Sequence, residues 1–476
     1  MTGPACLVGV GETPYAKWGG LGGTTEYDLA LRAIEAAVAD AGLTLDQVDG
    51  LASFAADRND AVFVAADLGL PELRHATMSW LPGGGGACAA VGNAAVAVEA
   101  RQAEVVVVYR SLCQGQFRRF GRGPGPRRAD GRPPGLRRAA SPLDAQAAFT
   151  MPFGMLSPPI TYAMVMQRHM HRFGTTSEHM GNVAVRFRDN AARNPRAVLG
   201  GTALTLADHQ ASRMVAEPLH LFDCCMENDG ACAVVVTTSA RADDCAKGAV
   251  EVLASAQGAA GAYGHGQYVN VYVDDDLYTS GGSQVVARDL WARAGIGPGE
   301  VDAAMIYDHF TGLVLLQLED YGFCGRGEGG PFFAETELPM NTHGGSLSEA
   351  YIHGLNHVVE GVRQLRGEST TPGPGAETCL VTSAAGVPSS GLVLGRRRPS
   401  TAWWCRLAAG VAGPATHPLR CARRAAAGPR PGRRSRARDR STRSPSCTRP
   451  SCPTWPSASP TWWPLSTWTR AAAPAW

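Results

Sequence analysis

Two short polar segments of this chain hold side chains that can move protons on a bound substrate. The first is Tyr-Asp-His-Phe-Thr over 307–311, and the second is Asn-Thr-His-Gly-Gly-Ser-Leu-Ser-Glu-Ala-Tyr-Ile-His-Gly over 341–354. Phenol, imidazole and carboxylate groups all serve as general acids or bases when their pKa suits the working pH. We therefore expect the two segments to form one site, although the same side chains would also fit a core with satisfied hydrogen bonds.

Both segments lie where an α/β fold positions its active site. The first follows an apolar run over 303–307, and the second passes from a glycine turn into an expected helix over 351–365. Strand ends and helix N-termini are the usual positions of catalytic groups in such folds. The partial positive charge of a helix N-terminus stabilises an oxyanion or enolate, and we expect it to favour Tyr351 as a phenolate.

The elements around these segments alternate between apolar strands and helices. Buried strands are expected near 105–109, 232–237, 250–253, 303–307, 379–382 and 392–394. Helices are expected over 27–42, 88–101, 161–194 with a break at Gly174, 283–294, 312–321 and 351–365. Uniformly apolar strands that alternate with helices indicate an α/β fold with a sheet covered on both faces. The similar order in the two halves suggests a duplicated architecture.

The last part of the chain differs in composition from the rest. Residues 396–476 contain 16 Arg, no Lys, one acidic residue and 7 of the 10 Trp, whereas residues 1–395 have a net charge of −13. An acidic body argues against nucleic-acid binding by the core. The tail has the composition of an out-of-frame reading of a GC-rich gene, so we expect it to be disordered or frameshift-derived. The alternative is a basic arm that binds nucleic acid through arginines and stacked aromatic rings.

Other features exclude several classes of protein. We see no secretory signal and no run of about 18 uncharged apolar residues, so we expect no membrane span. The 13 cysteines form no CxxC pair, which is typical of reduced thiols in the cytoplasm, and we expect no metal site. Gly9-Val-Gly11 lacks the third glycine of a dinucleotide loop. The vicinal pair Cys224–Cys225 fits either a redox or a buried structural role.

Four segments resemble the thiolase superfamily, and more narrowly its sterol-carrier-protein-x and lipid-transfer-protein branch. They are Val-Gly-Val-Gly-Glu-Thr over 8–13, Asp-Gly-Ala over 229–231 and the two polar segments, and the resemblance extends over about 1–395. It implies two similar halves in five α-β-α-β-α layers, a homodimer and an acyl-CoA substrate. The expected parts are an N-terminal half over 1–240 with a loop region over about 110–215, a C-terminal half over 241–395 and the tail over 396–476.

The departures from a working thiolase point to a different reaction. Thiolases place a nucleophilic cysteine at a helix N-terminus, but the matching position falls near Gly84, and Cys88 lies about one turn too late. The second thiolase cysteine would fall near Ala385. The first position of the thiolase [His/Asn]-Glu-Ala-Phe motif is Tyr307, and the histidine position of Gly-His-Pro is Tyr351. Both cysteines are therefore lost, and both oxyanion or base positions are tyrosines.

This pattern is similar to the steroid side-chain-cleaving retro-aldolases of the branch. Those enzymes cleave a β-hydroxyacyl-CoA, typically a 17-hydroxy steroid with a three-carbon CoA side chain, to a 17-ketosteroid and propionyl-CoA. The reaction needs a base for the tertiary hydroxyl and an acid for the thioester enolate, but no covalent cysteine. Tyr307 and Tyr351 are assigned to this pair in either order. The candidate orienting groups are Asp308, His309, His343 and His353.

The remaining candidates would bind the substrate. They are Gly84, Asn341, His343, Gly344, Gly345, Arg118 and Arg119. The glycine pair would let the backbone approach the thioester, and the asparagine would hold this turn together. The two arginines begin a stretch rich in Gly, Pro and Arg, which would bind a phosphorylated ligand or form a solvated loop.

Two other functions stay open at this point. One is an acetyl-CoA acetyltransferase or thiolase that acts on lipid acyl-CoA through Cys88 or another thiol, and the other is a non-catalytic subunit that binds acyl-CoA. The resemblance implies no bound cofactor, with acyl-CoA as the substrate. It also implies a hetero-oligomer with a small partner that carries an OB fold and a zinc ribbon.

Overall fold

Ten of the twelve strands that the structure describes form one mixed sheet, which joins the N-terminal and C-terminal halves of the chain, and the other two form a separate pair. The computed structural model describes residues 3–55, 57–79, 83–116, 151–155, 157–259, 282–383 and 389–397. The chain divides into two units, 1–412 and 413–476, and every described residue belongs to the first. The tail from residue 398 onward and the arginine-rich stretch over 117–150 therefore lie outside the described residues.

The strands and helices alternate along the chain as an α/β fold requires. The strands are β1 Ala5–Glu12, β2 Ala16–Lys17, β3 Gly50–Phe54, β4 His75–Ser79, β5 Val105–Cys113, β6 Met214–Ala216, β7 Leu219–His220, β8 Asn228–Thr238, β9 Val250–Gly258, β10 Ala303–Met305, β11 Thr378–Ser383 and β12 Ser389–Arg396. The helices are α1 Glu26–Asp40, α2 Ala61–Asp67, α3 Ala87–Glu99, α5 Pro158–Phe173, α6 Ser177–Ala191, α7 Leu206–Ala211, α8 Ser239–Ala242, α9 Ser283–Ala294, α10 Thr311–Asp320, α11 Gly329–Glu335, α12 Gly345–Ser348 and α13 Leu355–Arg366.

The strand order separates the two halves of the sequence within the sheet. The order is β10-β11-β12-β9-β1-β8-β5-β3-β4, and β2 pairs with β8 outside this path. Strands β3, β4 and β5 are parallel, as are β10 and β11, whereas the central pairs are antiparallel. Only two residue pairs, Cys6 with Glu251 and Leu7 with Val250, join β1 to β9. The sheet therefore consists of two parts that meet along a short seam.

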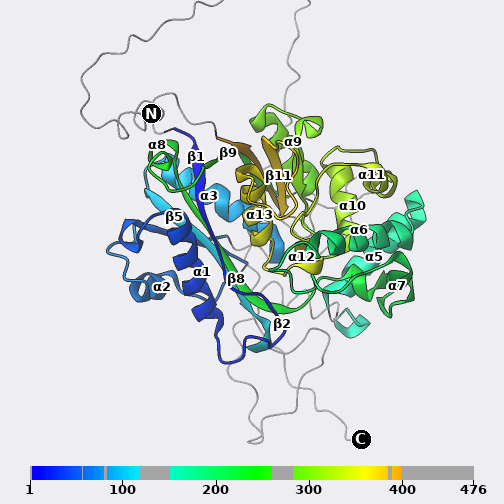
Figure 1. Ribbon diagram of the computed structural model, residues 1–476. Coiled ribbons are helices and arrows are strands. Elements are labelled where there is room, and N and C mark those ends of the chain that lie inside the picture. The colour runs from blue at the N-terminus through cyan, green and yellow to red at the C-terminus, as the bar shows by residue number, and fades with distance from the viewer. Residues whose placement is uncertain are drawn as a thin grey trace, which may run out of the picture. The chain divides into compact units, whose positions relative to one another are not determined.

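Three apolar cores define five layers of helix and sheet. One core packs α1 against the outer face of β1, β5 and β8, and another packs α3 and α13 between the two parts of the sheet. The third packs α9 and α10 against the opposite face of β9, β11 and β12. Figure 1 shows α1 at the left, α13 at the centre and α9 and α10 at the right. The predicted α-β-α-β-α layering is confirmed.

The apolar strands send alternate side chains into two different cores. In β5, Val105 and Val107 face α1, whereas Val106 and Val108 face α3. A strand buried on both faces needs an unbroken apolar run, because neither set of alternate positions meets water. The sequence prediction of buried strands is therefore confirmed.

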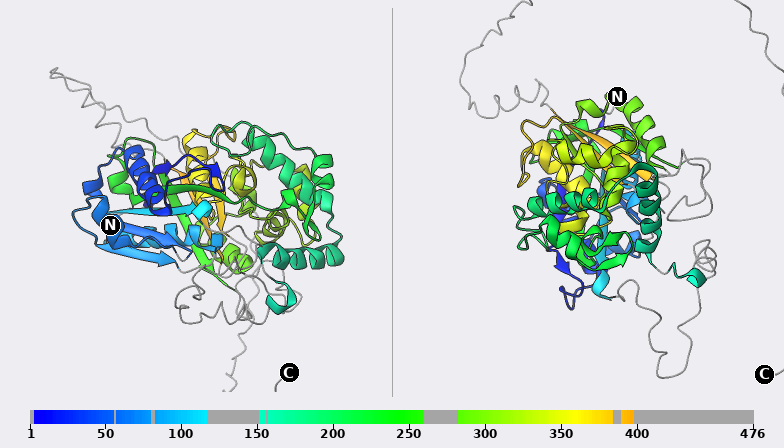
Figure 2. Two further views of the ribbon diagram at one scale, coloured as in Figure 1. Left: turned by 90° about the horizontal axis from the view of Figure 1, so that it is seen from below. Right: turned by 90° about the vertical axis from the view of Figure 1, so that its right-hand side faces the viewer.

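The second half of the N-terminal region adds a helical lobe beside the C-terminal strands. Helices α5 and α6 occupy the expected helical range over 161–194, and the predicted break at Gly174 is confirmed, because Gly174 ends α5 with a left-handed φ of 75°. Their apolar faces share the core of α9 and α10, and Figure 2 shows this teal and green lobe on the side opposite α1. None of the helices that the structure describes is long and apolar enough to cross a membrane.

Candidate active site

The two polar segments come together at the end of strand β10. Asn341 links them directly, because its Oδ1 accepts from the backbone N–H of Ile306 and its Nδ2 donates to the Ile306 carbonyl, both at 2.7 Å. Asn341 has a left-handed φ of 40°, a conformation that asparagine adopts more readily than most residues. Asn341 thus hydrogen-bonds both backbone groups of Ile306, just beyond the end of β10, and fixes the position of the residue before Tyr307.

The two candidate tyrosines lie within hydrogen-bond distance of each other. The Tyr307 hydroxyl donates to the Tyr351 hydroxyl at 3.2 Å. The Tyr307 backbone is held by Thr382, whose Oγ1 accepts from its N–H at 2.9 Å, and by Gln317, whose Nε2 donates to its carbonyl at 2.7 Å. Burial raises the pKa of Tyr307 well above its ordinary value, and the neighbouring Tyr351 adds to this effect. Tyr307 is therefore a neutral phenol at physiological pH.

The Tyr307 ring occupies the space that a side chain at Gly84 would need. A Cβ placed on Gly84 would lie 1.8 Å from Cζ and 2.0 Å from Oη of Tyr307. Gly354, with φ of 85°, closes the other side, since its Cβ would lie 2.9 Å from Cδ2 of the same ring. The thiolase resemblance places the nucleophilic cysteine near Gly84. In this structure the phenol of Tyr307 excludes any such side chain.

Cys88 is placed and protonated as a structural thiol. It is fully buried, its Sγ lies 3.2 Å from Oγ of Ser383, and it donates to the Val381 carbonyl at 3.4 Å. Burial raises the pKa of Cys88 to about 12. Because the thiolate is the nucleophilic form, this geometry gives no support to an acyltransferase that uses Cys88. The vicinal Cys224 and Cys225 also have pKa values raised by burial, and every described cysteine is a free thiol.

His309 is a neutral imidazole beside Tyr307. Its ring centroid lies 4.8 Å from that of Tyr307 and 4.7 Å from those of Tyr162 and Phe310. Burial lowers the pKa of His309 to about 3. Its Nδ1 is buried and has no hydrogen-bond partner among the residues that the structure describes. A buried polar atom without a protein partner is a natural contact for a substrate oxygen or hydroxyl.

His353 contacts Tyr351 and a buried arginine. The rings of His353 and Tyr351 pack edge to face with centroids 5.0 Å apart. Nε of Arg110, on β5, donates to Nδ1 of His353 at 3.2 Å. Desolvation and, next, the positive charge of Arg110 lower the pKa of His353 well below its ordinary value.

Asp308 faces away from the tyrosine pair. Its two carboxylate oxygens accept from the backbone N–H groups of Ser346 and Leu347 at 2.7 and 3.3 Å. His357 contacts Oδ1 of Asp308 at 3.1 Å through Nε2, and its Nδ1 lies 3.0 Å from Nε2 of His343. Asp308 and His343 therefore belong to a buried polar chain beneath the site, and they hold the glycine turn against β10.

The expected helix start at Tyr351 is wrong, because α12 ends at Ser348 and α13 starts at Leu355. The expected effect of that helix N-terminus on Tyr351 is wrong for the same reason. The Tyr351 backbone N–H instead donates to Oδ1 of Asn228 at 2.6 Å. The glycine pair is buried against protein: a Cβ on Gly344 would lie 2.6 Å from Ala191, and one on Gly345 would lie 2.0 Å from the Asp308 carboxylate. These glycines allow the segments to pack closely, because protein atoms fill the space that a side chain would need.

The residues that the sequence analysis missed interrupt apolar runs. Arg110 is the only charged residue of β5, and Gln317 is a buried polar residue within the apolar face of α10. Asn228, at the start of β8, has a buried Nδ2 with no hydrogen-bond partner among the described residues. A polar side chain inside an otherwise apolar strand or helix was the available signal, because such a group needs a specific partner.

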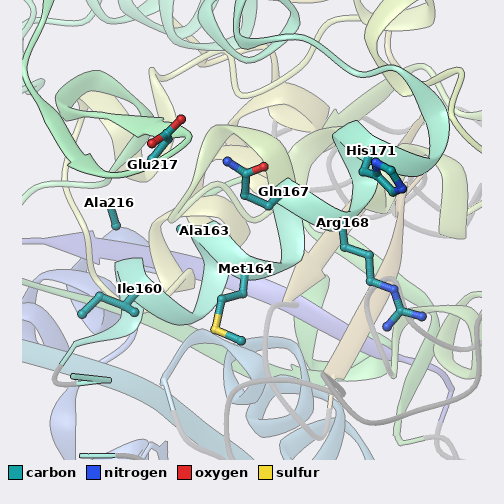
Figure 3. Close-up of a pocket in the computed structure, with 8 residues that line it drawn as sticks. All are labelled: Ile160, Ala163, Met164, Gln167, Arg168, His171, Ala216 and Glu217. Carbon is teal, nitrogen blue, oxygen red and sulfur yellow. The ribbon is translucent and has the colours of Figure 1, made fainter. Parts of the chain in front are cut away.

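Two further candidates and one pocket lie apart from the tyrosines. Arg118 and Arg119 fall outside the described residues. An open pocket of about 520 Å³ lies on the outward face of α5, at its junction with β6 (Figure 3). It is lined by Ile160, Ala163, Met164, Gln167, Arg168, His171, Ala216 and Glu217. No candidate catalytic residue lines it, so it is separate from the site built here.

Comparisons with known proteins agree with this geometry. A family model described as thiolase C-terminal domain-like matches residues 266–395, a range that includes both polar segments. The chain is 44% identical over 402 residues to a 17-hydroxy-3-oxo-4-pregnene-20-carboxyl-CoA lyase of Mycobacterium tuberculosis, covering 83% of this chain and 100% of that protein. It is 42% identical over 405 residues to a steroid side-chain-cleaving aldolase of Thermomonospora curvata, covering 84% and 99%. A solved structure described as an Ltp2-ChsH2(DUF35) aldolase matches with a TM-score of 0.75 and 40% identity, over 84% of this chain and 99% of that one.

Proposed function

This chain belongs to the thiolase-fold family of steroid side-chain-cleaving aldolases, and we propose that Tyr307 and Tyr351 are its acid–base pair. It is a carbon–carbon lyase that cleaves a steroid side-chain CoA ester by a retro-aldol reaction. The observation that supports this assignment most directly is the Tyr307 phenol in the side-chain space of Gly84, 3.2 Å from the Tyr351 hydroxyl. A proton-transfer pair thus stands where a covalent nucleophile would otherwise act.

The two phenols differ in the roles that they can take. Tyr307 stays neutral because it is buried, and it donates its proton toward the Tyr351 oxygen. A donor on that oxygen stabilises negative charge there. We therefore assign Tyr351 as the base and Tyr307 as the acid.

The reaction then proceeds in balanced proton and electron steps. Tyr351, as a phenolate, takes the proton from the tertiary β-hydroxyl of the substrate, and that oxygen forms the ketone as the bond between Cα and Cβ breaks. The electron pair of that bond passes into the thioester as an enolate. Tyr307 gives its proton to the enolate carbon, which yields propionyl-CoA. The proton that Tyr351 gained passes along the hydrogen bond to Tyr307 and restores both groups for the next turnover.

Two buried nitrogen atoms support binding of the thioester and the hydroxyl. Nδ1 of His309 and Nδ2 of Asn228 have no partner among the described residues, and each residue touches one of the tyrosines. An amide N–H placed on the enolate oxygen would stabilise the charge that develops when the C–C bond breaks. We assign Asn228 to this role and His309 to orienting the reacting group beside Tyr307.

The substrate and the assembly extend this proposal. The lyase of Mycobacterium tuberculosis is named for a carboxyl-CoA ester of a 17-hydroxy steroid, and the solved aldolase is named with a DUF35 partner. We propose a 17-hydroxy steroid CoA ester with a three-carbon side chain as the substrate, giving a 17-ketosteroid and propionyl-CoA. We also propose a homodimer that binds a small OB-fold and zinc-ribbon partner, in the cytoplasm, with neither nucleic acid nor a membrane involved.

The test is to identify the products of the full chain, purified alone and with a co-expressed partner. Each preparation is incubated with the steroid CoA ester, and propionyl-CoA, the ketosteroid and free CoA are measured by mass spectrometry. Release of the first two without free CoA is the expected result. An acylated protein would instead indicate thiolase chemistry, and tight binding of the ester without cleavage in either preparation would indicate a binding subunit.

A further inference from the structure

Arg110 is a buried charge in the middle of an apolar strand. Arg110 is 3% exposed, and every other residue of β5 is uncharged. Nη1 of Arg110 lies 3.0 Å from Oδ1 of Asp57 and 3.8 Å from Oε1 of Glu26, and both carboxylate side chains are almost fully buried. A buried guanidinium needs such partners, because an unpaired charge in the interior is strongly destabilising. The two carboxylates thus anchor one end of the arginine.

The other end of Arg110 fixes the protonation of a histidine. Nε of Arg110 donates to Nδ1 of His353 at 3.2 Å. A guanidinium only donates hydrogen bonds, so Nδ1 of His353 must present its lone pair. A neutral imidazole with a free lone pair on Nδ1 has its proton on Nε2. The chemistry of the contact therefore selects one tautomer.

His353 passes this constraint to the candidate base. It has a left-handed φ of 50° and lies in the short link between α12 and α13, two residues after Tyr351. Its ring packs against the Tyr351 ring at an interplanar angle of 82°. The hydrogen bond at Nδ1 and the left-handed backbone of His353 together restrict its ring to one orientation. The Tyr351 ring packs against the His353 ring in that orientation.

We propose that Arg110 is a positioning residue, which acts through His353 by fixing the neutral, Nε2-protonated ring against which the base Tyr351 packs. This inference rests on the proposed role of Tyr351. Glu26 and Asp57 hold Arg110 in place and do not touch the substrate. The contacts that position the base thus lead from Arg110 on β5, through His353 in the link between α12 and α13, to Tyr351.

The charges around His353 favour the same protonation state. Desolvation, the guanidinium groups of Arg110 and Arg58, and the neighbouring His309 all lower the pKa of His353. Tyr351 is the other titratable group in ring contact with it. Without Arg110 the largest of these charge effects disappears and the pKa of His353 rises, while desolvation still holds it below its ordinary value. The ring would then gain a proton at a higher pH than in the wild type, and its Nδ1 would lose the contact that orients it.

The test reads the His353 tautomer directly in the full chain. Histidine labelled with ¹⁵N gives distinct shifts for protonated and unprotonated ring nitrogens, and His353→Gln assigns the signal. The main variant combines Arg110→Met with Glu26→Gln and Asp57→Asn, so that no buried carboxylate is left unpaired. Arg110→Lys is the second variant, which keeps the charge but loses the planar guanidinium.

The wild type should show a proton on Nε2 and no titration of His353 between pH 5.5 and 8. In the triple variant we expect the His353 titration to move to higher pH and kcat to fall about 10-fold to 100-fold, the range for a small misplacement of a reacting group. KM for the ester should change little, and the loss of kcat should deepen as falling pH protonates His353. In Arg110→Lys we expect a similar loss of kcat, but this loss should not become larger at acidic pH.

A proton on Nδ1 in the wild type would overturn the proposal even if the variants do not fold. An unchanged His353 titration and kcat in a folded triple variant would also overturn it. A wild-type enzyme that cleaves no steroid CoA ester would refute the proposed function itself, whatever the tautomer. An Nδ1 proton in an active enzyme would remove only the role of Arg110.

Discussion

Tyr307→Phe removes a single oxygen from the site and leaves the rest of the ring in place. The ring is confined between Gly84 and Gly354, and its backbone is held by Gln317 and Thr382. None of these contacts depends on a hydrogen bond from the hydroxyl group. The substitution therefore loses the hydrogen bond to Tyr351, which is worth about 0.5–1.5 kcal/mol of unfolding free energy.

The expected effect on catalysis is much larger than the effect on stability. General acid–base catalysis by one positioned group contributes about 10²-fold to 10⁴-fold, which corresponds to about 2.7–5.4 kcal/mol of activation free energy at 1.36 kcal/mol per decade. We expect this loss in kcat, because the proton is transferred only as the enolate is protonated. KM for the CoA ester should stay nearly constant, since the hydroxyl adds little to binding of the ground state.

A buried tyrosine elsewhere in the same fold provides the control. Tyr321 is as buried as Tyr307, and its hydroxyl has no hydrogen-bond partner among the described residues. Tyr321→Phe should therefore keep kcat within about twofold, as expected for a change of at most about 0.5 kcal/mol. The assay follows propionyl-CoA release by mass spectrometry, with chemical denaturation to confirm folding. A folded Tyr307→Phe enzyme with kcat within about threefold of wild type would refute the acid assignment, as would an equal loss in Tyr321→Phe.

Four other substitutions test separate parts of the structure. Gly84→Ala should lower kcat by about 10²-fold or more, because the added Cβ would overlap the Tyr307 ring and displacing a reacting group by about 1 Å has an effect of that size. A normal kcat would contradict the packing of Tyr307 against Gly84. Cys88→Ser should stay active, and alkylating reagents should not inactivate the wild type through Cys88, since this thiol is buried. Inactivation of the wild type by alkylation, together with an acyl group trapped on the protein, would restore the thiolase hypothesis. Asn341→Ala should lower the free energy of unfolding by about 2–4 kcal/mol, because it leaves two buried backbone groups of β10's end unpaired; a smaller change in denaturation would count against the link. His309 stays neutral in the folded protein down to about pH 3 but protonates near pH 6.5 in the unfolded chain, so the free energy of unfolding falls as the pH drops from about 6.5 to 3. His309→Asn should reduce this slope by up to about 1.4 kcal/mol per pH unit. An unchanged slope would disprove the effect of burial on His309.

Residue types and spacing predicted an α/β fold with a covered sheet and singled out the two polar segments, whereas the five layers followed from the resemblance to the thiolase superfamily. Apolar strands reveal themselves in sequence because both faces are buried, as β5 shows with its two sets of valines. The resemblance to the thiolase superfamily also singled out Gly84 and Tyr307, each from a different motif. It could not show that the ring of one fills the side-chain space of the other, because that contact depends on how β10 and the turn before α3 pack together.

The errors in the second segment have a common physical origin. A glycine pair followed by polar residues suggests a loop open to ligands, and the sequence gives no sign that Ala191 and Asp308 fill that space. The start of α13 was also misplaced, because His353 and Gly354 both adopt left-handed φ values that delay the helix to Leu355. Such conformations are set by tertiary contacts, here the Tyr307 ring and Arg110, that local propensity does not report.

Desolvation separates the two chemistries that this fold can support. A thiolase nucleophile must ionise, and burial opposes that at Cys88 by raising its thiol pKa to about 12. The acid of a retro-aldol reaction must stay protonated until the enolate forms, and burial secures that at Tyr307 by raising its phenol pKa. The same dry interior that makes a cysteine inert therefore suits a tyrosine acid. Under the proposed mechanism, the Tyr307 phenol fills the side-chain space of Gly84, near which the thiolase resemblance places a nucleophilic cysteine.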